Sequence, residues 1–241
     1  MIGPGKPRYV EAMFTRISRR YDLLNTLMTG GMHYRWKARA TAIAARGQEG
    51  LGLDVATGTG DLAFSLAGRP GIRAVAALDF SPGMLRVALG KAGKRRTGDK
   101  VSFVWGDAME LPFAKNTFAA VTTSFSLRNV ADVPQVLREV RRVLKPGGRF
   151  VILEMTPLAP GPFNRLFRLY FHGFVPWMGR LVAGEREAYT YLPRSVDIFM
   201  TAQELAGAMR EAGFSDVRYR KAALGTVALH TGVKPGNKGQ V

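Results

Sequence analysis

The stretch "LGLDVATGTGDLA", residues 51 to 63, decides the fold of this chain. A short apolar run leads to an acid, Asp54, and then to two glycines one residue apart, Gly58 and Gly60. Glycines at this spacing let a buried strand turn tightly into a helix, which is how doubly wound sheets hold nucleotide-like cofactors. A plain strand-to-helix turn fits the motif equally well, so the rest of the chain has to decide between the two.

Apolar runs alternate with helix-period stretches after about residue 50, and this alternation predicts an α/β fold with a doubly wound parallel sheet. Residues 133–144 carry apolar side chains at helical spacing, and "KPGG" at 145–148 predicts that the helix ends there. Residues 8–48, which read as helices broken by "TGG" at 29–31, and residues 157–200 stand outside the alternation. Strands are expected at 51–56, 74–79, 101–105, 118–124, 149–154, 217–221 and 226–233.

This pattern divides the chain into three parts. We expect an N-terminal helical cap at residues 1–48 and a sheet domain at 49–234 with a helical insertion at 157–200. The short polar stretch at 235–241 is expected to be a disordered tail.

Composition narrows the classes of protein that are possible. The chain has 241 residues, 46% of them hydrophobic, which suffices for one substantial core. It has no cysteine, which excludes disulfides and thiolate metal sites, and its three histidines lie too far apart to predict a metal site. No long apolar run and no apolar signal core are found, so we expect a cytoplasmic protein. A formal net charge of +17 predicts an anionic partner, either nucleic acid or a phospholipid surface.

The glycine loop could hold a dinucleotide or S-adenosylmethionine. Gly58, Gly60 and Ala63 match the relaxed dinucleotide fingerprint, and Asp79 follows at about the expected distance of 20 residues. However, the charge of Asp54 would repel a pyrophosphate, whereas it suits a ligand with an ammonium and a sulfonium group. Asp79 is placed to accept hydrogen bonds from ribose hydroxyls, which both cofactors offer.

A second motif, "WGDAMELPF" at residues 105–113, directly follows the third expected strand. There the Asp107 carboxylate could accept from an adenine amino group while the amide of Ala108 donates to a ring nitrogen. The pieces "DVATGTG", "LDFS", "GDAMELPF" and "LKPGG", in this order, resemble class I S-adenosylmethionine-dependent methyltransferases. The resemblance implies a seven-stranded sheet with an antiparallel last strand and a cofactor at the carboxyl ends of the strands.

The resemblance extends outside the generic fold. "ISRRYDLLNTLMTGGMHYRWK", "LDFSPGML", "SFSLRNV", "YTYLPRSVDIF" and "GTVALHTGVK" are similar to the ubiquinone and menaquinone biosynthesis C-methyltransferases, from about residue 10 to 234. Members of that family methylate a ring carbon of a polyprenylated quinol. The resemblance thus implies demethylmenaquinol as the substrate, with 2-methoxy-6-polyprenyl-1,4-benzoquinol as the alternative.

The resemblance also assigns roles to residues. Arg128 and Asn129, just past the fourth strand, would act on the quinol, because an arginine can stabilise a phenolate or orient a water that takes the proton. Tyr21 and Asn25 would cover the pocket and touch the ring. Without the resemblance, Arg128 would be interpreted as a surface arginine and the "RRYDLLNTLM" helix as a packing helix. Cofactor contact is assigned to Asp54, Gly58, Thr59, Gly60, Asp79, Asp107, Ala108 and Ser124, and no metal ligand is expected.

Residues 161–184 are dense in aromatic and apolar side chains, interrupted by Arg165, Arg168 and Arg180. The segment is too charged to span a bilayer. It could be a lid, a helix pair packed on the sheet, or a helix lying among lipid headgroups. Because a long-tailed quinol resides in the bilayer, we expect docking to the anionic inner face of the cytoplasmic membrane, through side chains such as Phe167, Phe171 and Trp177.

Two other classes of function compete with a quinol methyltransferase. A nucleic-acid methyltransferase would explain the positive charge, but the chain shows no RNA-binding motif and no Asn-Pro-Pro-Tyr type loop, so no nucleic-acid partner is expected. A non-enzymatic module with this fold would not need the cofactor positions, which are all present. The sequence does not fix the oligomeric state, and a homodimer stays open.

Overall fold

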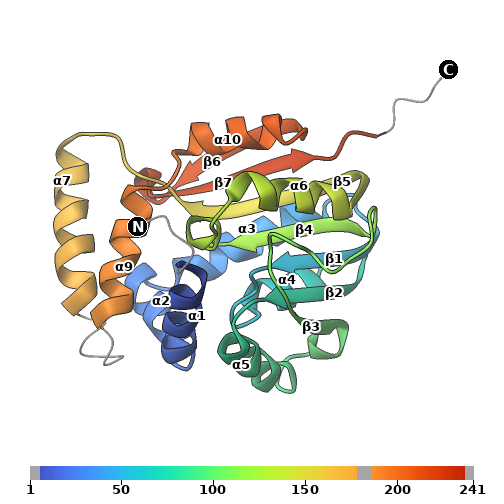
Figure 1. Cartoon of the computed structure of the whole chain (residues 1–241), viewed down its shortest axis with the longest axis horizontal. Coiled ribbons are helices and arrows are strands. Elements are labelled where there is room, and N and C mark those ends of the chain that lie inside the picture. Colours follow the sequence, from blue (N-terminus) through green and yellow to red (C-terminus); the bar gives the residue numbers. More distant parts are fainter. Residues whose placement is uncertain (1–5, 178–185, 237–241) are drawn as a thin grey trace.

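A computed structural model describes residues 6–177 and 186–236. Its centre is one sheet of seven strands in the order β3-β2-β1-β4-β5-β7-β6 (Figure 1). Among these strands only β7 runs antiparallel to its neighbours β5 and β6, which confirms the expected topology. The strands are β1 (Gly50–Val55), β2 (Ile72–Asp79), β3 (Val101–Trp105), β4 (Phe118–Ser124), β5 (Leu144–Met155), β6 (Ser215–Ala222) and β7 (Val227–Val233), close to the expected ranges.

Helices cover both faces of the sheet, so the central strands are apolar almost throughout. The helices α3 (Met32–Ala45), α4 (Asp61–Ala67) and α5 (Pro82–Ala92) lie on one face. The helices α6 (Val133–Val143) and α10 (Ala202–Glu211) lie on the other. Two hydrophobic clusters, one on each side of the sheet, hold these layers together.

Helix α6 ends where the sequence predicts, but "KPGG" does not form a loop. The apolar stripe of α6 is buried, and Asp132 caps the start of this helix by accepting a hydrogen bond from the amide of Gln135. Strand β5 begins directly at Leu144, which pairs with Phe118, while Arg149 pairs with Ala120. The four residues between them bulge from the strand, and the bulge requires glycine at 148, because a Cβ there would lie 2.8 Å from the Lys145 carbonyl oxygen.

The N-terminal helices are α1 (Lys6–Ile17), α2 (Tyr21–Thr29) and α3. Two consecutive glycines, Gly30 and Gly31, adopt left-handed φ angles of 55° and 77° and break the chain at the expected "TGG". Of these three helices, α1 and α2 lie over the strand ends, whereas α3 packs mainly on a face of the sheet. The cap is completed by α7 (Pro162–Leu169), the π-helical turn η3 (Tyr170–Phe174) and α9 (Arg186–Asp197), which lie beside α1 and α2 at the left of Figure 1.

Parts of three expected segments lie outside the described residues. These are the first five residues of the cap, the end of the aromatic segment (residues 161–184) with Arg180, and most of the C-terminal tail. Within residues 6–177 and 186–236, no helix combines the length and the apolar character needed to cross a membrane.

Candidate active site

Two cavities meet at the carboxyl ends of the parallel strands. The first is formed by the loops that follow β1 to β4, and we call it the cofactor cavity. The second, of about 480 Å³, lies between these loops and the cap, and we call it the substrate cavity. Phe14, Tyr21, Phe125 and Asn129 line both. A ligand in one cavity is therefore within reach of a ligand in the other.

The backbone of Gly58 and the carboxylate of Asp79 form the centre of the cofactor cavity. The Asp79 carboxylate accepts from the amide of Gly58 (2.7 Å) and from the amide of Ser81 (2.9 Å), which leaves each oxygen a lone pair for a ligand hydroxyl. Burial raises the pKa of Asp79 to about 6. Gly58 has φ +57°, and a Cβ there would meet no atom within 4 Å, so its backbone borders open space. These residues fit a cofactor with a ribose.

Asp107, Ala108 and Ser124 line the same cavity, as expected. The amide of Met109 donates to Asp107 Oδ1 over 2.9 Å, which fixes the carboxylate at the tip of the loop after β3. Five of the eight predicted cofactor residues are thus brought together: Gly58, Asp79, Asp107, Ala108 and Ser124.

The other three predicted cofactor residues, Asp54, Thr59 and Gly60, do not line the cavity. Asp54 is 1% exposed and accepts from the hydroxyls of Thr57 (2.6 Å) and Thr122 (2.8 Å). Burial raises the pKa of Asp54 to about 7. These two hydrogen bonds tie the glycine loop to β4, and Asp54 lines neither cavity. Gly60 serves close packing, because a Cβ there would lie 2.9 Å from Phe64.

The Thr59 side chain contacts the cap and lines neither cavity. Its hydroxyl donates to Asp22 Oδ1 of α2 over 2.6 Å, and Lys91 of α5 lies 2.8 Å from Asp22 Oδ2. Lys91 also lies 2.5 Å from Asp61, the first residue of α4. Two carboxylates therefore lie near the N-terminus of α4, where a pyrophosphate would bind. This arrangement disfavours the dinucleotide alternative.

The contact between Asp22 and Thr59 connects the cap to the glycine loop. Helix α2 also carries Tyr21, which lines both cavities. We expect Asp22→Ala to weaken S-adenosylhomocysteine binding about 3- to 10-fold, since a hydrogen bond to a partly exposed carboxylate contributes about 1 kcal/mol. Titration calorimetry measures the change. Asp22→Asn, which keeps an acceptor for Thr59, is the matched control and should retain most of the affinity. Equal affinity in the parent and the alanine variant would exclude this connection.

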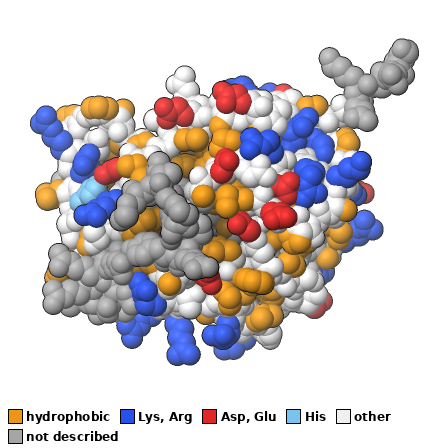
Figure 2. Space-filling model, viewed as in Figure 1, with side chains coloured by type: hydrophobic (Ala, Val, Ile, Leu, Met, Phe, Trp, Pro, Cys, Tyr) orange, Lys and Arg blue, Asp and Glu red, His pale blue; other side chains and the backbone are white. Residues whose placement is uncertain are grey.

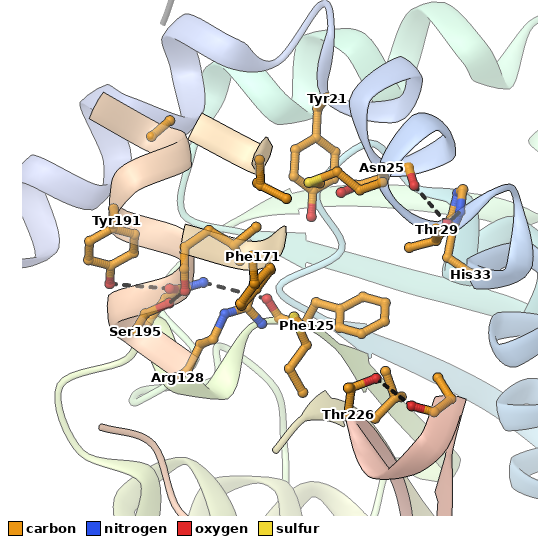
Figure 3. Close-up of a pocket in the computed structure, with 18 of the residues that line it drawn as sticks. Tyr21, Asn25, Thr29, His33, Phe125, Arg128, Phe171, Tyr191, Ser195 and Thr226 are labelled. Carbon is orange, nitrogen blue, oxygen red and sulfur yellow. Dashed lines mark hydrogen bonds between the residues drawn. The ribbon is translucent and has the colours of Figure 1, made fainter. Parts of the chain in front are cut away.

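Arg128 (Figure 3) and the neighbouring Asn129 lie in the wall of the substrate cavity, which is otherwise mostly apolar. The Arg128 guanidinium forms a buried ion pair with Glu154 Oε1, at the end of β5. Within the described part of the chain, Arg128 Nε and Glu154 Oε2 have no hydrogen-bond partner. Tyr191 of α9 donates to Asn129 Oδ1 over 3.2 Å. The three predicted catalytic residues, Arg128, Asn129 and Tyr21, all line this cavity.

Sequence reasoning missed several residues of this site. Glu154 is a carboxylate at the end of a buried strand, which is a usable signal for a site residue. Tyr191 lies in the stretch "YTYLPRSVDIF", whose sequence indicates no role for this single residue. The sequence predicts no role for His33, which lines the substrate cavity with Asn25 and Thr29. Phe125 separates the cavities with a left-handed φ of 56°, which no sequence pattern indicates.

The aromatic segment serves the cavity with part of its side chains. Phe171 is buried and Phe167 lines the substrate cavity. These two side chains were expected to face outward, toward a membrane, and they do not. Leu169 (73% exposed) and Trp177 (57% exposed) do lie on the surface. The described part of the segment, residues 161–177, therefore contributes to the wall of the site and exposes Leu169 and Trp177 on its outer edge.

The fold and the cofactor cavity together define an S-adenosylmethionine-dependent methyltransferase of the Rossmann-like class. The family model described as "ubiE/COQ5 methyltransferase family" matches residues 4–234. The chain belongs to this family, and it is a C-methyltransferase.

Curated relatives match over nearly their whole length. A demethylmenaquinone methyltransferase of Thermus thermophilus is 46% identical, covering 92% of this chain and all of that protein. A ubiquinone/menaquinone biosynthesis C-methyltransferase of Desulfotalea psychrophila is 47% identical, covering 96% and 91%.

Solved structures share the fold at low identity. An S-adenosylmethionine-dependent methyltransferase of Thermotoga maritima superposes with a TM-score of 0.61 at 18% identity, covering 92% of this chain and all of that one. A phosphoethanolamine N-methyltransferase of Haemonchus contortus, solved with S-adenosylmethionine, superposes with a TM-score of 0.58 at 17% identity, covering 86% and 57%.

Proposed function

We propose that the protein methylates a ring carbon of a polyprenylated quinol and that demethylmenaquinol is its substrate. The observation that carries this proposal is the apolar substrate cavity, which adjoins the cofactor cavity and has Arg128 in its wall. An apolar cavity suits a ring with an isoprenoid tail, and the names of the relatives from Thermus and Desulfotalea point to the same substrate class. The benzoquinol is the alternative substrate.

The residues at the site suit carbon methylation. Bound S-adenosylmethionine supplies an electrophilic methyl group. A quinol carbon becomes nucleophilic when the neighbouring hydroxyl loses its proton, and the Arg128 guanidinium can stabilise the resulting phenolate. The ring carbon would take the methyl group from the sulfur, which would keep the bonding electrons, and the same carbon would then release its hydrogen as a proton to solvent.

Methyl transfer to short-tailed, chemically reduced quinols tests the proposal. Radiolabelled S-adenosylmethionine is supplied with either the naphthoquinol or the benzoquinol, and the oxidised quinones serve as controls because they lack the nucleophilic ring. We expect a higher kcat/KM with the naphthoquinol. A higher value with the benzoquinol would favour the alternative, and no transfer to either ring would overturn the proposed function.

We further propose that the cap docks on an anionic membrane, where the substrate resides. Large apolar side chains are exposed on neighbouring cap elements: Leu23 and Leu27 on α2, and Leu169 at the end of α7. Tyr170 donates to the Met28 carbonyl over 3.2 Å, so α2 and η3 lie side by side. Lys and Arg side chains are prominent along the lower rim of the molecule in Figure 2. Exposed apolar side chains beside cations suit a headgroup region.

Replacing Leu169 and Trp177 together with serine should weaken binding to anionic liposomes about 10-fold, because two large apolar side chains no longer enter the interface. Co-sedimentation with vesicles of phosphatidylglycerol and phosphatidylcholine measures the effect, and added salt should weaken binding of the parent without abolishing it. The matched control replaces Leu89 on α5 and Trp105 at the end of β3, a pair of similar exposure outside the cap. This control variant should bind the liposomes as the parent does. Equal loss in both pairs would contradict docking through the cap.

A further inference from the structure

The substrate cavity has two polar regions. Arg128, Asn129 and Tyr191 form one, and Asn25, Thr29 and His33 form the other, at the junction of α2 and α3. In Figure 3 the second group lies across the cavity from Arg128 and Tyr191, with Phe125 and Phe171 drawn between them. A ring with polar substituents at opposite positions matches such a cavity.

The contacts of Thr29 determine which ring nitrogen of His33 carries hydrogen. Thr29 Oγ1 lies 2.7 Å from the Asn25 carbonyl oxygen and 2.8 Å from His33 Nδ1. The hydroxyl has one hydrogen, and the carbonyl can only accept, so the hydroxyl donates to Asn25. The hydrogen in the second contact must then come from His33 Nδ1.

His33 is neutral, and its other ring nitrogen is a bare acceptor. Burial, aided by the charge of Lys37, lowers the pKa of His33 to about 4. A neutral imidazole holds one hydrogen, which is already on Nδ1, so Nε2 presents a lone pair. The side chain is 2% exposed, and Nε2 has no hydrogen-bond partner among the residues that the structure describes. A buried acceptor without a donor costs about 1–3 kcal/mol, which a ligand hydroxyl would recover.

We propose that His33 Nε2 accepts a hydrogen bond from the quinol hydroxyl that lies across the ring from Arg128, and that this contact selects the quinol over the quinone. This inference rests on the proposed function. A quinol hydroxyl has a hydrogen to donate, whereas the carbonyl of the oxidised ring would place its own lone pair against that of Nε2. The enzyme would thereby admit the nucleophilic form of the ring and disfavour the form that cannot be methylated.

Direct binding of both ring forms tests the inference. Calorimetry is done on protein loaded with S-adenosylhomocysteine, which prevents turnover, with a short-tailed naphthoquinol under anaerobic reducing conditions and with the matching naphthoquinone under air. The parent should bind the quinol more tightly than the quinone. If the parent binds neither the quinol nor the quinone, the proposed function fails. The binding of the His33 and Thr29 variants tests only the role of His33.

Two substitutions separate the nitrogens of His33. His33→Asn keeps an amide that can donate to Thr29 but has no group at Nε2, and it should weaken quinol binding about 3- to 10-fold without weakening quinone binding. His33→Gln places an amide oxygen near Nε2 and should restore quinol binding. An equal loss for both ring forms in His33→Asn would show a purely structural role and overturn the inference.

Thr29→Val tests the tautomer. Without the hydroxyl, Nδ1 loses its acceptor, and the hydrogen can move to Nε2, which then donates. We expect this variant to bind the quinone more tightly than the parent does and to lose most of its preference for the quinol. An unchanged ratio of the two affinities would contradict the assigned tautomer.

Discussion

Arg128→Ala is expected to lower turnover about 100- to 1000-fold, the loss typical of removing one preorganised donor to a developing charge. The affinity for S-adenosylmethionine should stay near that of the parent, because Arg128 lines the substrate cavity and not the cofactor cavity. Steady-state kinetics with a short-tailed quinol, combined with calorimetry for the cofactor, measures both quantities. Unaltered turnover would remove Arg128 from the reaction.

The ion pair with Glu154 requires a control for stability. Removing Arg128 alone leaves a buried, unpaired carboxylate, which costs about 3–5 kcal/mol of folding free energy. The double variant Arg128→Met with Glu154→Gln removes both charges and should recover most of the unfolding free energy in urea. Its turnover should stay low. Recovery of turnover together with stability would show that Arg128 acts only on the fold.

Asp79→Ala is expected to weaken S-adenosylmethionine binding at least about 100-fold. The loss of a charge-assisted hydrogen bond to the ribose accounts for about 1.5–3 kcal/mol. In addition, the amides of Gly58 and Ser81 lose their acceptor, so the glycine loop is no longer held in place. Calorimetry with S-adenosylhomocysteine measures the affinity.

Asp79→Asn is the matched control for this prediction. An asparagine oxygen can still accept one of the two amides, so its affinity should lie between those of the parent and the alanine variant. Circular dichroism checks that all three proteins are folded. If the alanine variant is folded and binds with the affinity of the parent, Asp79 is not part of the cofactor site.

The central strands could be predicted from the sequence because they are largely buried on both faces and so appear as apolar runs between turn signals, whereas the antiparallel direction of β7 was implied by the family resemblance. All seven expected strands are present, and the glycine break between α2 and α3 lies where "TGG" predicts it. The bulge at "KPGG" could not be predicted, since proline and glycine indicate a helix end equally well before a loop or before an irregular strand. The place of α3 on the sheet depends on tertiary packing.

The site was predictable where a residue follows a strand and less so elsewhere. Asp79 ends β2, whereas Asp107 and Arg128 follow β3 and β4, and parallel strands bring their carboxyl ends to one edge. Thr59 and Asp54 occupy similar positions but are satisfied by Asp22 and by two threonine hydroxyls, partners that no local pattern reveals. His33 could not be assigned because its role depends on the hydrogen bond from Nδ1 and on the cavity beside it.

The substrate cavity draws on nearly the whole chain, from Met13 on α1 to Val227 at the start of β7. During synthesis α1 leaves the ribosome long before β7, which lies between β5 and β6 in the sheet. A nascent chain that stops short of β7 would therefore carry the glycine loop but only part of the wall of the substrate cavity.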